Sequence, residues 1–223
     1  MLSGAIFDMD GTLLDDMASW EQLVYEFIGM LGVEPKNELA NQLAKMTIKQ
    51  ACAYMREKYD ISSDADKIEA DINAIVERRY LYEYPLKAGA KELLERLKAE
   101  GVKMCVATST AERLAKAALK RTGVLDLFEG VFSSDIVGSG KTTPRLYNIA
   151  LQSLGTPKDK TMVFEDVIFA LRVAKNDGFL TAAVYDSNEK DQEGMRSTAD
   201  VYIEDLSDID KYWSKLVNEI VNH

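Results

Sequence analysis

Cysteine and histidine are nearly absent from this sequence of 223 residues, which contains two cysteines and one histidine. The histidine is the final residue, His223, and neither Cys52 nor Cys105 has a second ligand at the spacing of a zinc site. We therefore expect no zinc site. Both cysteines lie in apolar stretches, which predicts two buried thiols in a reducing compartment.

Basic residues are outnumbered by acidic ones. The sequence has 27 lysines and arginines against 37 aspartates and glutamates, a formal net charge of −10. A negative field of this kind repels nucleic acids and anionic membranes, so we expect neither as a partner. An anionic small substrate would need a local positive charge or a metal ion at its binding site.

Long apolar runs, repeats and low-complexity segments are also missing. No apolar stretch approaches the roughly 18 residues that a transmembrane helix needs, and no basic leader precedes the first apolar strand. We expect a cytoplasmic protein. The C-terminal stretch at 212–221 is expected to pack on the protein's own core, which predicts a monomer.

The chain has two textures. Between residues 16 and 84, apolar residues recur at spacings of three and four, which predicts helices at 23–33, 43–59 and 67–82. After Pro85, helical stretches alternate with short apolar strands, which indicates a parallel sheet with helices on both faces. The strands are expected at 4–8, 102–108, 130–134, 161–165, 180–185 and 200–203. The sequence thus predicts an α/β protein, with a Rossmann-like core from 1–15 and 85–223 and an inserted all-helical cap at 16–84.

Two aspartates, Asp8 and Asp10, follow the first strand. Ligands of open parallel sheets bind at the carboxyl ends of the strands, and residues two apart in extended chain point to the same side. Two such charges are unfavourable unless a cation neutralises them or one holds a proton. Mg²⁺ prefers oxygen ligands, and a carboxylate beside it can attack phosphorus. The alternative is an Asp-Gly turn or a helix cap involving Gly11.

Two other strands end in polar residues. Glu165 and Asp166 follow an apolar strand and offer a second arm for a metal ion, although a surface strand end would look the same. Thr108 and Ser109 end another strand just before a helix, where a phosphate oxygen can bind. An ordinary helix N-cap is the alternative for this pair.

The loop GSGKTTP at 138–144 supplies Lys141. It is not a P-loop, because Asp135 stands where that motif requires glycine. A lone loop lysine is usually solvated, but a lysine beside a pair of acids is the counter-charge that a phosphoryl group needs.

These motifs together resemble the haloacid dehalogenase-like phosphatase superfamily. The sequence is similar to the branch with a helical cap after the first motif, which includes β-phosphoglucomutase-like and phosphoglycolate phosphatase-like enzymes. The resemblance covers essentially the whole chain: DMDGT at 8–12, then Thr108, Lys141 and the acid pair at 165–166 follow in the family order. It implies a Mg²⁺-dependent phosphatase that hydrolyses a small phosphorylated metabolite, chiefly a sugar phosphate, through an aspartyl-phosphate.

The resemblance also implies a role for each residue. Asp8 would be the nucleophile, and Asp10 the general acid and then the general base. Thr108 would hold a phosphoryl oxygen, and Lys141 would balance the charge of Asp8 and the phosphate. Mg²⁺ would be bound by the Asp8 carboxylate, the Asp10 backbone carbonyl and Asp166, with Glu165 nearby. The acid at position 10 argues against the dehalogenase and phosphonatase branches.

Some positions depart from the family pattern. Thr142 and Arg145 replace proline and aspartate of the third motif, and Val167 and Ala170 replace serine and glycine after the acid pair. None of these changes deletes a catalytic group, but they bear on rate, metal affinity and substrate preference.

Two alternatives to a phosphatase stay open. One is a phosphoglucomutase-type transferase, which often carries a histidine at the cap hinge where this chain has Trp20. That difference favours hydrolysis, although Trp20 is equally explained as cap packing. The other is a low-turnover protein that binds a phosphorylated metabolite. The family's specificity stretch would fall at 45–50, where Lys45, Thr47 and Lys49 are not assigned because such lysines are usually solvated.

Overall fold

The computed structural model describes residues 1–15, 25–26, 29, 53–54, 56–58 and 65–219. The chain divides into two compact units, one made of Met1–Asp16 and Tyr84–His223 and the other of Met17–Glu83. We call the first the core unit. It contains the sheet and all of the residues to which the sequence analysis assigns a catalytic, substrate-binding or metal-binding role.

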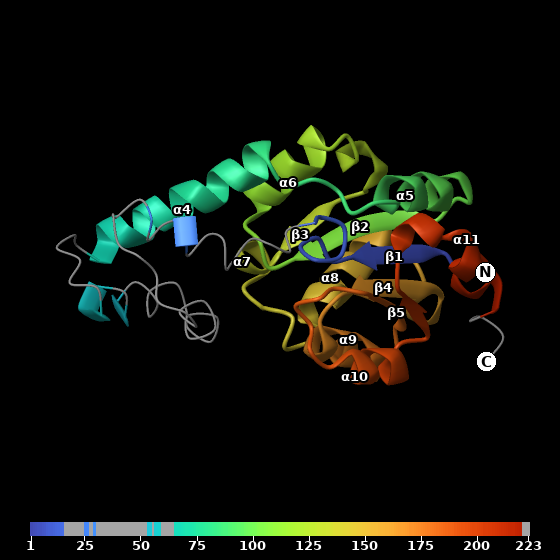
Figure 1. The fold of residues 1–223 in the computed structure, drawn as a ribbon. Helices are drawn as coiled ribbons and strands as arrows, with labels where there is room; N and C mark the ends of the chain where they lie inside the picture. The colour runs from blue at the N-terminus through green and yellow to red at the C-terminus, as the bar shows by residue number, and fades with distance from the viewer. Residues whose placement is uncertain (16–24, 27–28, 30–52, 55, 59–64, 220–223) are drawn as a thin grey trace. The chain divides into compact units, whose positions relative to one another are not determined.

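The core unit is built on a six-stranded, wholly parallel sheet in the order β3-β2-β1-β4-β5-β6 (Figure 1). The strands are β1 (Gly4–Phe7), β2 (Lys103–Thr108), β3 (Val131–Ser133), β4 (Thr161–Glu165), β5 (Leu180–Val184) and β6 (Val201–Ile203). Each predicted strand is confirmed, with ends that differ by no more than one residue. The interior strands read as continuous apolar runs because the sheet is buried on both faces.

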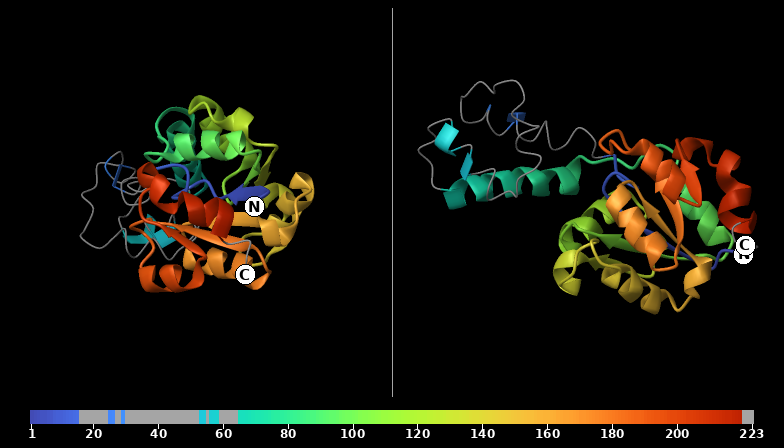
Figure 2. Two further views of the ribbon diagram at one scale, coloured as in Figure 1. Left: turned by 90° about the vertical axis from the view of Figure 1, so that its right-hand side faces the viewer. Right: turned by 90° about the horizontal axis from the view of Figure 1, so that it is seen from below.

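Helices cover both faces of this sheet (Figures 1 and 2). On one face lie α5 (Ala90–Ala99) and α6 (Glu112–Arg121), and on the other α8 (Arg145–Leu154) and α9 (Ile168–Asn176). Shorter helical segments complete the unit: α7 (Ser134–Val137), α10 (Gln192–Thr198), α11 (Asp210–Ser214), a π-helical turn at Lys215–Glu219 and 3₁₀ turns at Leu125–Leu127, Lys158–Lys160 and Leu206–Asp208. The predicted α/β class with a Rossmann-like core is confirmed.

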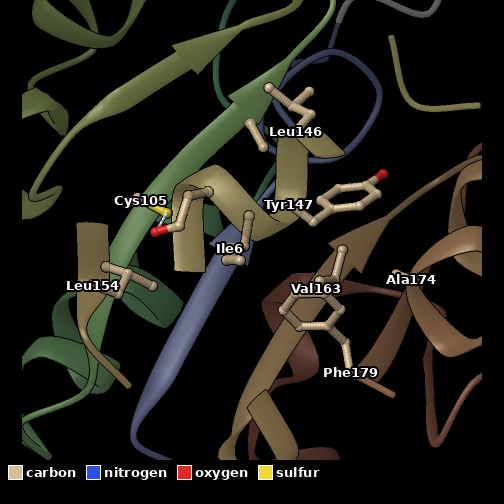
Figure 3. Close-up of a cluster of buried hydrophobic side chains, with 10 residues drawn as sticks. Ile6, Cys105, Leu146, Tyr147, Leu154, Val163, Ala174 and Phe179 are labelled. Carbon is tan, nitrogen blue, oxygen red and sulfur yellow. Dashed lines mark hydrogen bonds between the residues drawn. The ribbon is translucent and has the colours of Figure 1, made fainter. Parts of the chain in front are cut away.

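Helix α8 seals one face of the sheet by packing on β1, β2 and β3. Its apolar residues recur at helical spacing, and the helix ends at Gly155, whose φ of 63° suits a left-handed C-cap. Figure 3 shows the resulting cluster of buried side chains. Its members are Ile6, Cys105, Ala107, Leu146, Tyr147, Ala150, Leu154, Val163, Ala174 and Phe179. Cys105 is a free thiol, and burial raises its pKa, so it is the inert core residue that the sequence predicts; Cys52 lies outside the described residues.

The chain leaves β1 through a tight turn and is then paired with the segment that returns to the core. Leu14 forms an antiparallel bridge with Leu86, and the amide of Lys87 donates to the carbonyl of Leu13 over 2.8 Å. These bonds fix the turn that follows β1. Leu216 and Val217 near the other end of the chain are buried in the core unit, as expected.

In the second unit, the described part contains α4 (Ala65–Tyr82), which confirms the helix expected at 67–82. Glu26 pairs with Arg78 and Arg79 of this helix over 2.8 Å in each case. The other expected helices, Trp20 and the stretch at 45–50 fall wholly or largely outside the described residues, and the role of 16–84 as a cap stays a prediction. Among the described residues, no helix is both long and apolar enough to cross a bilayer.

Candidate active site

The site lies where the strand order of the sheet reverses. Strands β2 and β3 extend to one side of β1 and strands β4, β5 and β6 to the other, so β1 and β4 border the switch point at which such sheets bind ligands. Asp8 directly follows β1, and its amide donates to the carbonyl of Phe164 over 2.9 Å. Glu165 ends β4 and Asp166 follows it. The pairing of two adjacent parallel strands therefore brings three carboxylates to one edge.

These three carboxylates form a buried cluster. Each offers an oxygen, and the oxygens lie within 4.8 Å of one another. Asp8 is 5% exposed, Glu165 is fully buried and Asp166 is 7% exposed. Three negative charges at such distances need positive charge close by.

Lys141 supplies one positive charge. Its Nζ contacts Asp8 Oδ1 and lies 2.7 Å from Glu165 Oε1, and the side chain is 6% exposed. Burial by itself lowers the pKa of Lys141, but the two carboxylates outweigh it and the net pKa is raised. The side chain therefore remains cationic. Lys141 is therefore not a solvated loop lysine, and its role as the counter-charge of a phosphoryl group stays a prediction.

Lys141 provides a single positive charge for three carboxyl groups. Burial raises the pKa of Glu165 to about 7 against the opposing effect of Lys141, and burial together with Asp8 and Glu165 raises the pKa of Asp166. Within the described part of the chain, Glu165 Oε2 is a buried oxygen that has no hydrogen-bond donor. An orphaned carboxylate oxygen beside two further acids fits a hard divalent cation such as Mg²⁺.

The turn after β1 fits closely around this cluster. The Thr12 hydroxyl donates to Asp166 Oδ1 over 3.1 Å and reaches Asp8 Oδ2 at 3.5 Å. Gly11 has a φ of 77°, and a Cβ atom there would lie 2.3 Å from Asp166 Oδ2. Only glycine combines the left-handed backbone with this close approach, which gives the Asp-Gly pair a reason beyond turn formation.

Asp10 is held on the other side of the turn by two threonines from the segment after β2. Thr108 Oγ1 donates to Asp10 Oδ2 over 3.3 Å, and Thr110 Oγ1 donates to the same oxygen over 2.7 Å. The amide of Thr110 in turn donates to Thr108 Oγ1 over 3.0 Å. Asp10 is half-buried and the neighbouring Ser109 is exposed. Asp10 and Thr108, which the sequence singled out separately, are thus in contact, while Ser109 lies at the surface.

Two contacts were not predicted from the sequence. Thr110 was not singled out, although it stands two residues after Thr108 in the stretch TST. Tyr147 was not singled out either, and its hydroxyl donates to Glu165 Oε1 over 2.6 Å. Burial and the neighbouring Glu165 raise the pKa of Tyr147, so the phenol keeps its proton and acts as a donor.

A further buried ion pair flanks the site. Asp186, two residues beyond β5, is 2% exposed. Lys87 Nζ donates to Asp186 Oδ2 over 3.1 Å and to the carbonyl of Tyr185 over 2.9 Å. The carboxylate lies close to the turn at Gly11, where a Cβ would be 3.2 Å from Asp186 Oδ2. Asp186, like Glu165, stands at the end of a short apolar strand in the sequence. The same argument from strand ends could therefore have predicted it.

A comparison with known families matches residues 5–184 to the haloacid dehalogenase-like hydrolases. The chain belongs to this family. The matched range runs from β1 to β5 and contains Asp8, Asp10, Thr108, Lys141, Glu165 and Asp166. The family resemblance and the predicted enzyme class, a phosphatase or hydrolase of this family, are therefore confirmed.

Curated members and solved structures of this hydrolase family align along most of the chain. The phosphorylated carbohydrates phosphatase of Thermotoga maritima is 26% identical over 179 residues, covering 79% of this chain and 82% of the relative. Protein CbbY of Rhodobacter capsulatus is 30% identical over 217 residues, covering 92% and 94%. A structure of a candidate β-phosphoglucomutase from Thermotoga maritima superposes with a TM-score of 0.86 at 22% identity, covering 97% of this chain and all of that one. At that identity the superposition shows the shared fold alone.

Proposed function

We propose that this hydrolase is a Mg²⁺-dependent phosphatase that cleaves a small phosphorylated metabolite, a sugar phosphate, through a phosphorylated Asp8. The observation that carries this proposal is the buried Lys141, which contacts both Asp8 and Glu165 at the edge of a three-carboxylate cluster. Phosphoryl transfer depends chiefly on positioning and on stabilising negative charge, and this arrangement supplies both.

The reaction has two balanced steps. In the first, a carboxylate oxygen of Asp8 forms a bond to phosphorus, the bond from phosphorus to the leaving oxygen breaks, and that oxygen takes the proton of the Asp10 carboxyl group. In the second, Asp10 removes a proton from water, the water oxygen bonds to phosphorus, and the acyl-phosphate bond breaks to restore Asp8. Lys141 holds Asp8 and offsets charge on the phosphoryl oxygens throughout.

A divalent cation fits this scheme through the donor set already described. Its ligands would be the carboxylates of Asp8 and Asp166 and the backbone carbonyl of Asp10, with Glu165 adjacent. Bound there, it supplies positive charge to the phosphoryl group. Thr108 and Thr110 orient the Asp10 carboxyl group, and we assign Thr108 and Ser109 to the phosphoryl or substrate side of the site.

The substrate class is supported by the relatives. The relative from Thermotoga maritima is described as a phosphatase of phosphorylated carbohydrates, and it aligns with about four-fifths of this chain. The net charge of −10 disfavours polyanionic macromolecules and leaves a small phosphate ester as the fitting substrate.

The test is phosphate release from a panel of sugar phosphates and small phosphate esters, with Mg²⁺ or with a chelator. Asp8→Asn should abolish turnover while leaving the fold intact, because an amide is a poor nucleophile and a weaker metal ligand. Asp159→Asn is the matched control, since it removes the same charge from an exposed position at the amino end of β4. Asp8→Asn with undiminished activity would refute the covalent mechanism. Sugar-phosphate isomerisation without phosphate release would instead identify a mutase.

A further inference from the structure

Tyr147 combines a buried ring with a hydroxyl group that leaves the hydrophobic core. The ring lies in the apolar cluster beneath α8 and contacts Phe179 edge-to-face, with centroids 6.2 Å apart. It belongs to the largest side chains that are completely buried in the described structure. Figure 3 shows its hydroxyl pointing away from the other labelled side chains of the cluster. Packing thus fixes the ring and, with it, the position of the phenolic oxygen.

The hydroxyl is the first link in a chain of contacts that ends at Asp8. Tyr147 donates to Glu165 Oε1 over 2.6 Å, and the same oxygen accepts from Lys141 Nζ at 2.7 Å. Lys141 then contacts Asp8 Oδ1. Each of these four side chains is at least nine-tenths buried.

This chain connects three separate parts of the core unit. Tyr147 comes from α8, Glu165 from the end of β4, and Asp8 follows β1. Of these groups, only the phenol is anchored by a rigid ring in the apolar core. Lysine and glutamate have several rotatable bonds each, and their positions depend on their partners.

We propose that Tyr147 is a positioning residue of the phosphoryl-transfer reaction: its hydroxyl fixes the Glu165 carboxylate so that Lys141 is held against Asp8. This inference rests on the proposed phosphatase function. Without the hydroxyl, Glu165 Oε1 retains Lys141 as its partner but loses the anchor in the core. Small displacements of a charge-stabilising group are costly in phosphoryl transfer because the step depends on alignment.

The test compares Tyr147→Phe with the wild-type full-length chain, using p-nitrophenyl phosphate and saturating Mg²⁺. We expect kcat to fall about tenfold and KM to change by less than about threefold, since the lost interaction serves the transition state. Inorganic phosphate should bind about threefold more weakly by calorimetry. Activities are scaled to the folded fraction measured by urea unfolding.

Tyr202→Phe is the matched control. Its hydroxyl donates to Gln192 Oε1 over 2.7 Å, far along the sheet on β6, so the variant loses the same atom and a similar bond. Its kcat should equal that of the wild type. A second comparison introduces Tyr147→Phe into the Glu165→Gln variant. In that background Tyr147→Phe should lower kcat by less than about twofold, because both changes act through the side chain at position 165.

An unchanged kcat for Tyr147→Phe overturns the inference while leaving the phosphatase intact. A tenfold loss that persists in the Glu165→Gln background also overturns it, because Tyr147 would then not act through Glu165. If the wild type releases phosphate from no ester, the proposed function fails. Phosphate binding then decides on Tyr147, and equal affinity in the two proteins, or no binding by either, refutes the positioning role.

Discussion

The buried carboxylate cluster predicts that stability falls as pH rises when divalent cations are removed. Glu165 has an ordinary pKa of 4.5, which the unfolded chain retains, and burial raises its pKa to about 7 in the folded protein. Between those pH values the folded state binds more protons than the unfolded state. The free energy of unfolding therefore decreases across this window, and the stability is greatest below pH 4.5 as far as this group is concerned.

The size of the effect follows from the two pKa values. The folded and unfolded pKa values of Glu165 differ by about 2.5 units. At 1.36 kcal/mol per unit, the free energy of unfolding falls by about 3 kcal/mol. Asp166 shifts in the same direction and adds to it. Few other side chains titrate between pH 4.5 and 7, because the sequence has a single histidine. Carboxyl groups with lowered pKa values, such as Asp177, lose their contribution only below the window.

The assay is urea unfolding at pH 4.5 to 7.5, with chelator and with saturating Mg²⁺. With chelator, the free energy of unfolding should fall by about 3 kcal/mol, equivalent to roughly 6 to 12 °C in Tm for a chain of this size. With Mg²⁺, the fall should disappear, because a bound cation favours the ionised carboxylates. Glu165→Gln should remove the share of Glu165, about 3 kcal/mol, and leave the contribution of Asp166. Stability that is flat or rising in chelator, or a Mg²⁺ effect equal at both ends of the range, would contradict this account.

Three substitutions test other parts of the site. Lys141→Met should lower kcat by more than about a hundredfold, because it leaves the buried carboxylates without their counter-charge. For the same reason it should destabilise the fold by about 3 kcal/mol at pH 7 without a divalent cation. Unchanged urea unfolding would contradict this expectation. Gly11→Ala should weaken Mg²⁺ binding in calorimetry, since its Cβ would lie 2.3 Å from Asp166 Oδ2 at a φ of 77°; wild-type affinity would show that the turn tolerates the change. Asp186→Asn should cost about 2 kcal/mol in urea unfolding by removing the charge opposite Lys87, whereas an effect below about 0.5 kcal/mol would make the pair energetically neutral.

The parallel sheet was predictable because its signal is local. Each strand is a short apolar run bounded by helical periodicity, and a sheet covered on both faces requires that pattern. The polar residues at strand ends were also predictable in outline. Asp8 directly follows β1 and Glu165 ends β4, and parallel strands present their carboxyl ends at one edge.

The contacts within the site were less predictable, because they depend on side-chain direction and on which strands are neighbours. Chain order places β4 far from β1, and only the pairing of these strands brings Glu165 to Asp8. Tyr147 shares its helical spacing with the apolar residues of α8, and periodicity does not reveal where its hydroxyl ends. Lys87 lies in a stretch that reads as an ordinary polar helix start, and its buried partner is 99 residues away.

None of the four departures from the family pattern replaces a charged residue of the buried cluster. Thr142 is exposed in the loop before α8, Arg145 is exposed at the first residue of α8, and Val167 is half-buried after the acid pair. Ala170 is fully buried in α9, where its methyl group is part of the apolar packing. The buried lysine and the three carboxylates around it are therefore preserved, while the changes alter the rim and the helix behind it. Charge stabilisation of phosphoryl transfer depends on the interior groups, so these substitutions are expected to act on substrate selection and binding more than on the chemical step.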